Sequence, residues 1–311
     1  MLQAYSTFGK KNASMVGRSY ALSSALFSTL MAVLMKLPAE TSSYSVVYFG
    51  GITNMLLSQL LEDEPEEKRQ GPWPSEPESR TNVLLRAMFS FLGNTIAPLA
   101  IRLNSVQIYA VILSLSTNFS VFIDCFFLGK KQGWVVWVCS VTAVIGVVIC
   151  IDPAFLGFGQ LHLENINIFG IVLTLGFAFK KGCIRAFQAN RYLSSSNNLL
   201  YNGIGAVIAT TLMNMMFGSK PTLKGIQADW PYIVSYSLIY VPFQICNFRS
   251  LVLEKNTSIC AILFCFNVIF SFIIDITVMG KPFMVSKLIG SVVVFLSAVI
   301  TIWSKSKKRK N

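Results

Sequence analysis

Apolar runs recur along almost the whole chain, from Tyr20 to Trp303, and each is about as long as the ~20 residues that a helix needs to cross the hydrocarbon of a bilayer. Only 13% of the 311 residues are charged and 53% are hydrophobic, whereas soluble chains carry about 25% charged residues. The sequence therefore predicts an all-α polytopic membrane protein and disfavours a water-soluble enzyme.

Loop signals rich in Gly, Pro and charge divide the apolar sequence into ten expected spans. We expect them at 19–37, 44–61, 83–101, 105–128, 134–152, 167–186, 198–217, 230–249, 257–279 and 285–303. This predicts an N-terminal tail (1–18), a five-helix unit (19–152) with an acidic loop (62–82), a second five-helix unit (167–303) and a basic tail (304–311). Any function must then lie among the helices.

The basic residues predict the topology. With the N-terminus in the cytosol, 20 of the 26 Lys and Arg residues fall on the cytosolic side, which satisfies the positive-inside rule. Both termini are then cytosolic, in either the plasma membrane or an endomembrane. The alternative, that Tyr20 to Leu37 is a cleaved signal peptide, would leave nine spans. Because the positive charge lies in loops and tails, the expected partners are the lipid bilayer and a small-molecule solute, and no nucleic acid.

Several chemistries are disfavoured by composition. His162 is the only histidine and falls in an expected loop, so a His-based catalytic set or a His-rich metal site is not expected. The seven Cys lie within or beside apolar runs, which does not indicate a disulfide framework. No ATP-binding loop occurs. We expect neither an enzyme nor a cofactor.

The chain contains an internal repeat. Offsetting it by 151 residues aligns eight identities between 105–130 and the ninth span, including a shared Ser-x-x-x-Asp and a Gly-Lys ending. The paired residues are Ile108 with Ile259, Ala110 with Ala261, Phe119 with Phe270, Ser120 with Ser271, Ile123 with Ile274, Asp124 with Asp275, Gly129 with Gly280 and Lys130 with Lys281. A weaker match at an offset of 149 pairs the first span with the sixth. Five spans separate the copies, an odd number, so the sequence predicts two inverted five-helix repeats.

This organisation resembles the drug/metabolite transporter superfamily, specifically its EamA-like branch. The resemblance rests on the two inverted five-helix repeats and on the short links between spans three and four and between spans eight and nine. It also rests on the basic residue that ends span one and on the Leu128-Gly129 and Met279-Gly280 endings. It implies relatedness to nucleotide-sugar and organic-phosphate exchangers and to metabolite exporters. Lys130 and Lys281 stand where the branch often has an acid, so the resemblance does not transfer a substrate.

Charged residues inside spans are candidates for solute binding because burying them in hydrocarbon is costly. Lys181 lies on the polar stripe of the sixth span and is suited to a phosphate or carboxylate, with snorkelling to the interface as the equal alternative. Lys36 lies on the corresponding stripe of the first span. Lys180 points about 100° away from Lys181, and we expect it to snorkel.

Two further spans carry polar faces at helical spacing. The eighth span has Tyr236, Tyr240, Gln244 and Asn247 on one face, and the third has Ser90, Gly93, Asn94 and Ala97. The sequence predicts that these faces meet across a cavity and, with Asn94 among them, bind a polar solute. Helix-helix adhesion is the alternative.

Asp124 and Asp275 each lie about one turn inside a helix end and, in an inverted repeat, at opposite mouths of a cavity. As a hypothesis they act as symmetric gates, or one of them carries a coupling proton. The alternatives are capping of a helix end and pairing with the adjacent Lys. The sequence thus favours a secondary transporter or exchanger of a small polar, anionic solute working by alternating access. A non-transporting membrane scaffold with the same fold stays open, as does a homodimer.

Overall fold

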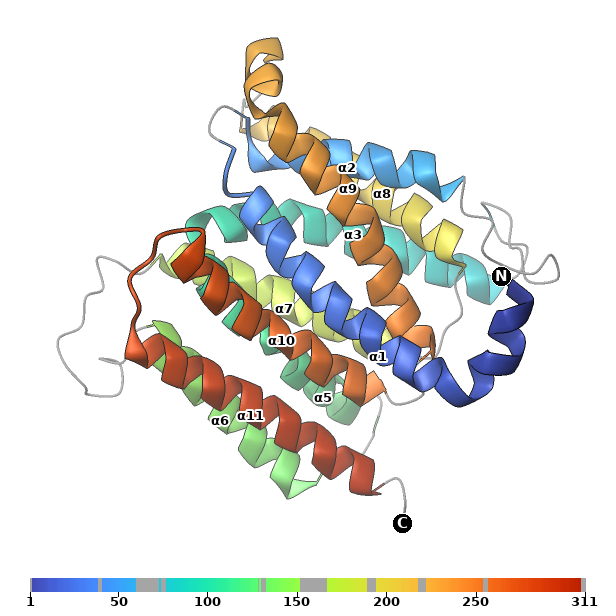
Figure 1. Cartoon of the computed structure of the whole chain (residues 1–311), viewed down its shortest axis with the longest axis vertical. Helices are drawn as coiled ribbons and strands as arrows, with labels where there is room; N and C mark the ends of the chain where they lie inside the picture. The colour runs from blue at the N-terminus through green and yellow to red at the C-terminus, as the bar shows by residue number, and fades with distance from the viewer. Residues whose placement is uncertain are drawn as a thin grey trace.

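The structure, a computed structural model, describes residues 2–38, 41–59, 73, 77–127, 129, 133–151, 167–188, 194–217, 222–253 and 257–308. All regular secondary structure in these residues is α-helical (Figure 1). The helices are α1 (Leu2–Leu34), α2 (Ser43–Ser58), α3 (Pro77–Leu103), α4 (Val106–Ser114), α5 (Ser116–Phe126), α6 (Trp134–Ile151), α7 (Ile168–Gln188), α8 (Ser195–Met216), α9 (Leu223–Leu253), α10 (Thr257–Thr277) and α11 (Val285–Lys308). The predicted all-helical fold is confirmed.

The observed helices overlap every predicted span, with one break inside a span and differences at several helix ends. The span predicted at 105–128 is two helices, α4 and α5, which meet where the N–H of Leu115 turns back to the carbonyls of Ile112 and Leu113. Helix α1 begins well before residue 19, and α11 extends beyond 303. Most of the acidic loop 62–82 and all of the loop around His162 lie outside the described residues.

Four of the described helical stretches are long and apolar enough to cross a bilayer. They are Ser79–Leu103, Val106–Ile123 across α4 and α5, Trp134–Ile151 and Ser196–Met216. On α6 the side chains of Val138, Val141 and Val144 are each more than half exposed. An exposed row of β-branched side chains is costly in water and favourable against lipid.

Serines begin several helices and glycines end two of them. The hydroxyls of Ser42, Ser105 and Ser194 accept hydrogen bonds from the first turns of α2, α4 and α8. Gly129 after α5 and Gly280 after α10 have φ of 63° and 62°, a conformation that disfavours any side chain. These are the two glycines that the 151-residue offset aligns.

The helices pack in pairs along the bundle. Helix α2 packs on α8 and α6 on α11, while α1 packs on α9 and α10, and α3 on α7 and α8 (Figure 1). Glycines allow the closest approaches: a Cβ on Gly203 would lie 2.6 Å from the carbonyl oxygen of Gly51, and one on Gly290 would lie 2.6 Å from that of Gly146.

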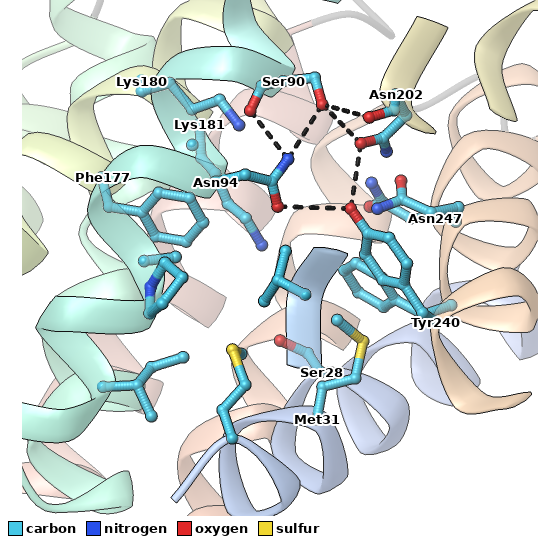
Figure 2. Close-up of a pocket in the computed structure, with 18 of the residues that line it drawn as sticks. Ser28, Met31, Ser90, Asn94, Phe177, Lys180, Lys181, Asn202, Tyr240 and Asn247 are labelled. Atoms are coloured by element: carbon cyan, nitrogen blue, oxygen red, sulfur yellow. Dashed lines mark hydrogen bonds between the residues drawn. The ribbon is translucent and has the colours of Figure 1, made fainter. Parts of the chain in front are cut away.

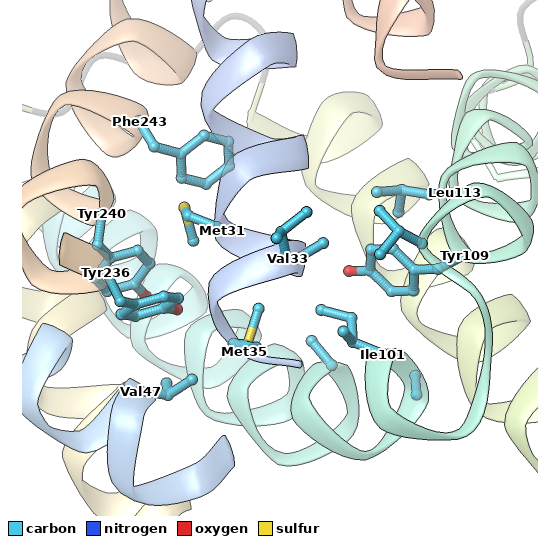
Figure 3. Close-up of a cluster of buried hydrophobic side chains, with 14 of the residues drawn as sticks. Met31, Val33, Met35, Val47, Ile101, Tyr109, Leu113, Tyr236, Tyr240 and Phe243 are labelled. Atoms are coloured by element: carbon cyan, nitrogen blue, oxygen red, sulfur yellow. The ribbon is translucent and has the colours of Figure 1, made fainter. Parts of the chain in front are cut away.

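A core of buried apolar side chains lies where α1, α3, α4 and α9 converge. It includes Met31, Met35, Ile101 and Leu113 (Figure 3). The hydroxyl-bearing rings of Tyr109, Tyr236 and Tyr240 belong to the same cluster. The core therefore borders a region in which polar and aromatic groups meet.

Candidate solute-binding cavity

A cavity of about 110 Å³ lies between α1, α3, α7, α8 and α9, next to this core. Helices α3 and α9 supply most of its polar lining, as the spacing of their polar faces predicts. We call it the central cavity. A space of this size holds several water molecules, and its lining combines polar groups with aromatic rings, as small-molecule sites do.

Three cationic side chains line the central cavity, namely Arg86 from α3 and Lys180 and Lys181 from α7. Arg86 is 9% exposed, and its Nη2 donates a hydrogen bond to Oε1 of Gln244 at 3.1 Å. None of the residues described as lining the cavity is Asp or Glu. The cavity wall thus carries an excess of positive charge.

The Lys181 ammonium lies against aromatic rings. Its Nζ is 4.4 Å from the ring centre of Phe264, 5.6 Å from that of Phe177 and 5.7 Å from that of Phe243. Each contact is within the range of cation–π attraction. Phe177 also lies 5.1 Å from Nζ of Lys180, so one ring contacts two ammonium groups (Figure 2).

Lys180 reaches the cavity because α3 carries a glycine at the point of contact. A Cβ on Gly93 would overlap the space that Nζ of Lys180 occupies. The expectation that Lys180 turns away and snorkels is therefore wrong. Its side chain packs over Gly93. Figure 2 shows that it points into the cavity.

Beside the lysines, four residues form a hydrogen-bonded wall (Figure 2). The Ser90 hydroxyl lies 2.7 Å from Oδ1 of Asn202 and 3.0 Å from Nδ2 of Asn94. The Tyr240 hydroxyl lies 3.1 Å from Oδ1 of Asn202 and 3.4 Å from Oδ1 of Asn94. We call Ser90, Asn94, Asn202 and Tyr240 the polar wall. It joins α3, α8 and α9.

Six of the seven residues expected to bind solute line the central cavity: Lys181, Tyr236, Tyr240, Gln244, Asn247 and Asn94. Tyr236 is 1% exposed and stacks on Tyr240, with ring centres 5.4 Å apart. The predicted small and polar face of α3 lines the cavity with all four of its members.

Sequence reasoning missed Arg86 and Asn202. Arg86 is one of the 20 basic residues that the topology prediction places on the cytosolic side, and it lies one turn before Ser90 on the same helical face. That i, i+4 spacing was the available signal. Asn202 had no comparable signal, because its role depends on which face of α8 meets α3.

The seventh residue, Lys36, lies elsewhere. It follows α1 and donates a hydrogen bond to the carbonyl oxygen of Asn104 at the end of α3. Nearby, Oδ2 of Asp275 accepts the N–H of Gln107 at 3.1 Å, and the Gln107 side chain donates to Ser291 at 3.0 Å.

We call Lys36, Asn104, Gln107, Asp275 and Ser291 the Asp275 cluster. Asp275 is 3% exposed, and its Oδ1 has no hydrogen-bond partner. Helix capping therefore accounts for the hydrogen bond of only one of the two carboxylate oxygens. The side chain of Asp124, its counterpart in the repeat, lies outside the described residues.

Residues 15–151 match the sequence model of the EamA-like transporter family. This part of the chain is therefore similar to that family. Its members are membrane transporters of small solutes, and the apolar helices agree with an integral multi-pass membrane protein. The expected kinship with the EamA-like branch is confirmed.

The fold extends beyond the matched residues. A protein of known crystal structure superposes with a TM-score of 0.58 at 11% sequence identity. The alignment covers 93% of this chain and 96% of that one. At this identity the likeness concerns the fold alone. No curated protein matches the sequence.

Proposed function

We propose that this protein is a secondary transporter that carries a small anion through the central cavity by alternating access. The observation that carries the proposal is the charge of the lining: Arg86, Lys180 and Lys181 face the cavity with no acidic residue among the described lining residues. Burying cations in a membrane protein is costly, and such groups mark solute pathways. An anion in the cavity would offset that cost.

The geometry of the three cations suits a phosphate or carboxylate group. Arg86 uses one guanidinium nitrogen on Gln244, which leaves other donors of its fork for a bidentate contact. Lys181 and Lys180 rest on aromatic rings, whose attraction is weaker than a charged hydrogen bond. An anion would therefore draw both ammonium groups off the rings.

Alternating access is supported by paired features of the two halves. The contact of α1 with α9 has its counterpart in that of α3 with α7, as an inverted repeat requires. Ser120 and Ser271 each donate to a carbonyl three residues earlier, and Gly129 and Gly280 end their helices in the same conformation. Two such halves can exchange outward-open and inward-open arrangements by rocking.

The Asp275 cluster is the proposed gate at one mouth of the path. It ties the ends of α1, α3 and α10 to the starts of α4 and α11. The repeat assigns the same role to Asp124 at the other mouth. With both termini on the cytosolic side, as proposed from the basic residues, Asp275 guards the opposite side.

The test uses purified protein and proteoliposomes with two matched pairs of probes: propyl phosphate with glycerol 3-phosphate, and propionate with glycerate. We expect at least one anion to raise the melting temperature and to be transported, because a ligand of the folded state stabilises it by mass action. Lys181→Ala should weaken binding about 10-fold to 100-fold, the size of a charge-assisted hydrogen bond.

Lys224→Ala is the matched control because it removes one exposed lysine at the start of α9. It should leave binding and transport unchanged. Equal losses in the two variants would contradict a site at Lys181. Absence of binding and transport for all four anions would refute the anion proposal and favour the scaffold.

A further inference from the structure

Buried polar atoms without partners are concentrated in one part of the bundle. Among the described residues, seven buried side-chain nitrogen or oxygen atoms lack a hydrogen bond, and five of these belong to Asn54, Arg86 and Asn198. Asn54 is 0% and Asn198 is 1% exposed, and both atoms of each amide are unpartnered. Leaving such a group unpaired costs about 1–3 kcal/mol, so four amide atoms in one region indicate an absent partner.

Arg86 lines the central cavity, Asn198 lies one helical turn from a lining residue, and Asn54 lies one turn from a residue that packs against the lining. Asn198 precedes Asn202 of the polar wall by four residues on α8, and Arg86 precedes Ser90 by four on α3. Asn54 follows Gly50 by four on α2, and a Cβ on Gly50 would lie 2.7 Å from the Tyr236 ring. Residues four apart share a helical face, so all three continue the faces that meet at the cavity.

Each of these pairs defines a step of four residues from the region of the cavity toward an unpartnered side chain. These steps run in one direction along the bundle. Helices α2 and α8 are antiparallel, because the Ser196 hydroxyl meets the carbonyl of Ser58 while Gly203 meets Gly51. The step from Gly50 to Asn54 on α2 therefore goes in the same direction along the bundle as the step from Asn202 back to Asn198 on α8.

Helices α3 and α9 are likewise antiparallel, because Arg86 meets Gln244 while Asn94 meets Tyr240. The step from Ser90 back to Arg86 on α3 thus goes in the same direction as the step from Tyr240 to Gln244 on α9. Figure 1 shows α2 and α9 running toward the end of the bundle where the N-terminus lies, and α3 and α8 running away from it. All four steps lead toward that end.

We propose that Asn54, Arg86, Asn198 and Gln244 form a second subsite, the inner polar layer, which binds hydroxyl groups of the transported anion. This inference rests on the proposed function and names its substrate class as hydroxylated anions. A bare anionic group only accepts hydrogen bonds and would leave the amide oxygens of Asn54 and Asn198 unpaired. A hydroxyl both donates and accepts, so it can satisfy an amide at both ends.

Arg86 connects the two subsites. It lines the central cavity and donates to Gln244, and its unpartnered Nε belongs to the same set of atoms as the two amides. A solute with its charge between Arg86 and the lysines can extend its hydroxyls toward Asn54 and Asn198. The same layer then discriminates between anions of equal charge, because the lysines attract all of them alike.

The test compares analogues that share a skeleton and differ by two hydroxyls. Dissociation constants are measured for glycerol 3-phosphate against propyl phosphate, and for glycerate against propionate, with purified protein. Wild type should bind the hydroxylated member of a pair at least about 10-fold more tightly, the value of one to two hydrogen bonds. Asn198→Ala and Asn54→Ala should each reduce that ratio several-fold and leave the bare anion unaffected.

Asn267→Ala is the control, since it truncates an equally buried asparagine that bonds Thr29 on α1 instead. It should preserve the ratio. Because the two layer amides have no partner, their removal should not lower the melting temperature, so loss of folding does not obscure the result.

The outcomes separate the two proposals. Equal binding of both members of each pair, or a ratio that survives both layer variants, overturns the inner polar layer while the anion transporter stands. No binding of any of the four anions overturns the transporter and the layer with it. A hydroxyl preference lost in Asn198→Ala and kept in Asn267→Ala supports both.

Discussion

The region around the central cavity and the α6–α11 pair use the same small residue for opposite purposes. At the pair, a Cβ on Gly290 would lie 2.6 Å from the carbonyl oxygen of Gly146 and 2.7 Å from the backbone nitrogen of Cys150. At the cavity, a Cβ on Gly93 would meet the mobile end of Lys180. One glycine lets two backbones touch, whereas the other leaves room for a charge.

The difference extends to the surrounding side chains. The α6–α11 contact is bordered by Val293 and Val294, and the outward face of α6 is apolar and exposed. The cavity is bordered by the polar wall and by three cations. Small residues let helices pack closely in lipid and so help to hold them together. We therefore expect stability to depend on the first region and solute binding on the second.

The largest expected effect is a loss of stability in Gly290→Ala. The obstructing atoms belong to the backbone of α6 and cannot rotate away, so the helices must separate. Overpacking of this kind costs about 1–3 kcal/mol, which corresponds to a melting temperature lower by about 2–10 °C. Thermal unfolding of the purified protein measures it.

Gly176→Ala on α7 is the control for that substitution. A Cβ there meets nothing within 4 Å, so it should leave the melting temperature unchanged or raise it, as alanine favours a helix over glycine. Similar melting temperatures for Gly290→Ala and Gly176→Ala would contradict the packing role of Gly290.

The second effect is on binding, in Gly93→Ala. The new methyl group displaces the Lys180 ammonium from the cavity wall, and the flexible side chain yields without moving α3 or α7. We expect affinity for the transported anion to fall about 10-fold, within the value of a charge-assisted hydrogen bond, with little change in melting temperature. A stability loss as large as that of Gly290→Ala would show that the two glycines do not differ in kind.

Much of the difference between the two regions could be predicted from the sequence. Hydropathy located the helices, and the spacing of Tyr236, Tyr240, Gln244 and Asn247 predicted the face that lines the cavity. The inward position of Lys180 was not accessible, because it depends on a glycine in another helix. Spacing assigns a residue to a face of its own helix, and contacts between helices decide where a long side chain ends.

The same reason explains the other residues that sequence reasoning did not place. The positions of Asn54 and Asn198 depend on the antiparallel packing of α2 on α8, which places both residues on the same side of the cavity along the bundle. Lys36 shares a polar stripe with residues of α1, yet its ammonium bends to the end of α3 beyond the cavity. A helical face says nothing of residues that follow the helix.

The third effect is a smaller loss of binding in Tyr240→Phe. The hydroxyl joins α9 to Asn94 and Asn202, while Ser90 keeps its own contact with Asn202. Removing one member of a network that remains otherwise satisfied costs about 1 kcal/mol, or about 5-fold in the dissociation constant of the anion. Titration calorimetry on the purified protein measures it. Retained affinity would make Tyr240 a packing residue.

The smallest effect concerns Asp275→Asn and falls on the rate of transport. The amide keeps an oxygen that can accept the N–H of Gln107, so the fold and the central cavity should be preserved. It removes the negative charge of the Asp275 cluster, which attracts the Lys36 ammonium. If the cluster is a gate, the closed state loses stability, and the maximal rate changes a few-fold while the dissociation constant stays the same.

Transport measured in proteoliposomes over a range of external pH separates gating from proton coupling. A coupling carboxylate must bind and release the proton in each cycle, so its amide variant would lose the dependence of uptake on a proton gradient. A gate carboxylate only holds the helix ends, so the variant would keep that dependence with an altered rate. An unchanged rate and an unchanged pH dependence would remove both roles and leave Asp275 as the cap of α4. That result would place the cluster with the α6–α11 pair, as a structural contact outside the solute path.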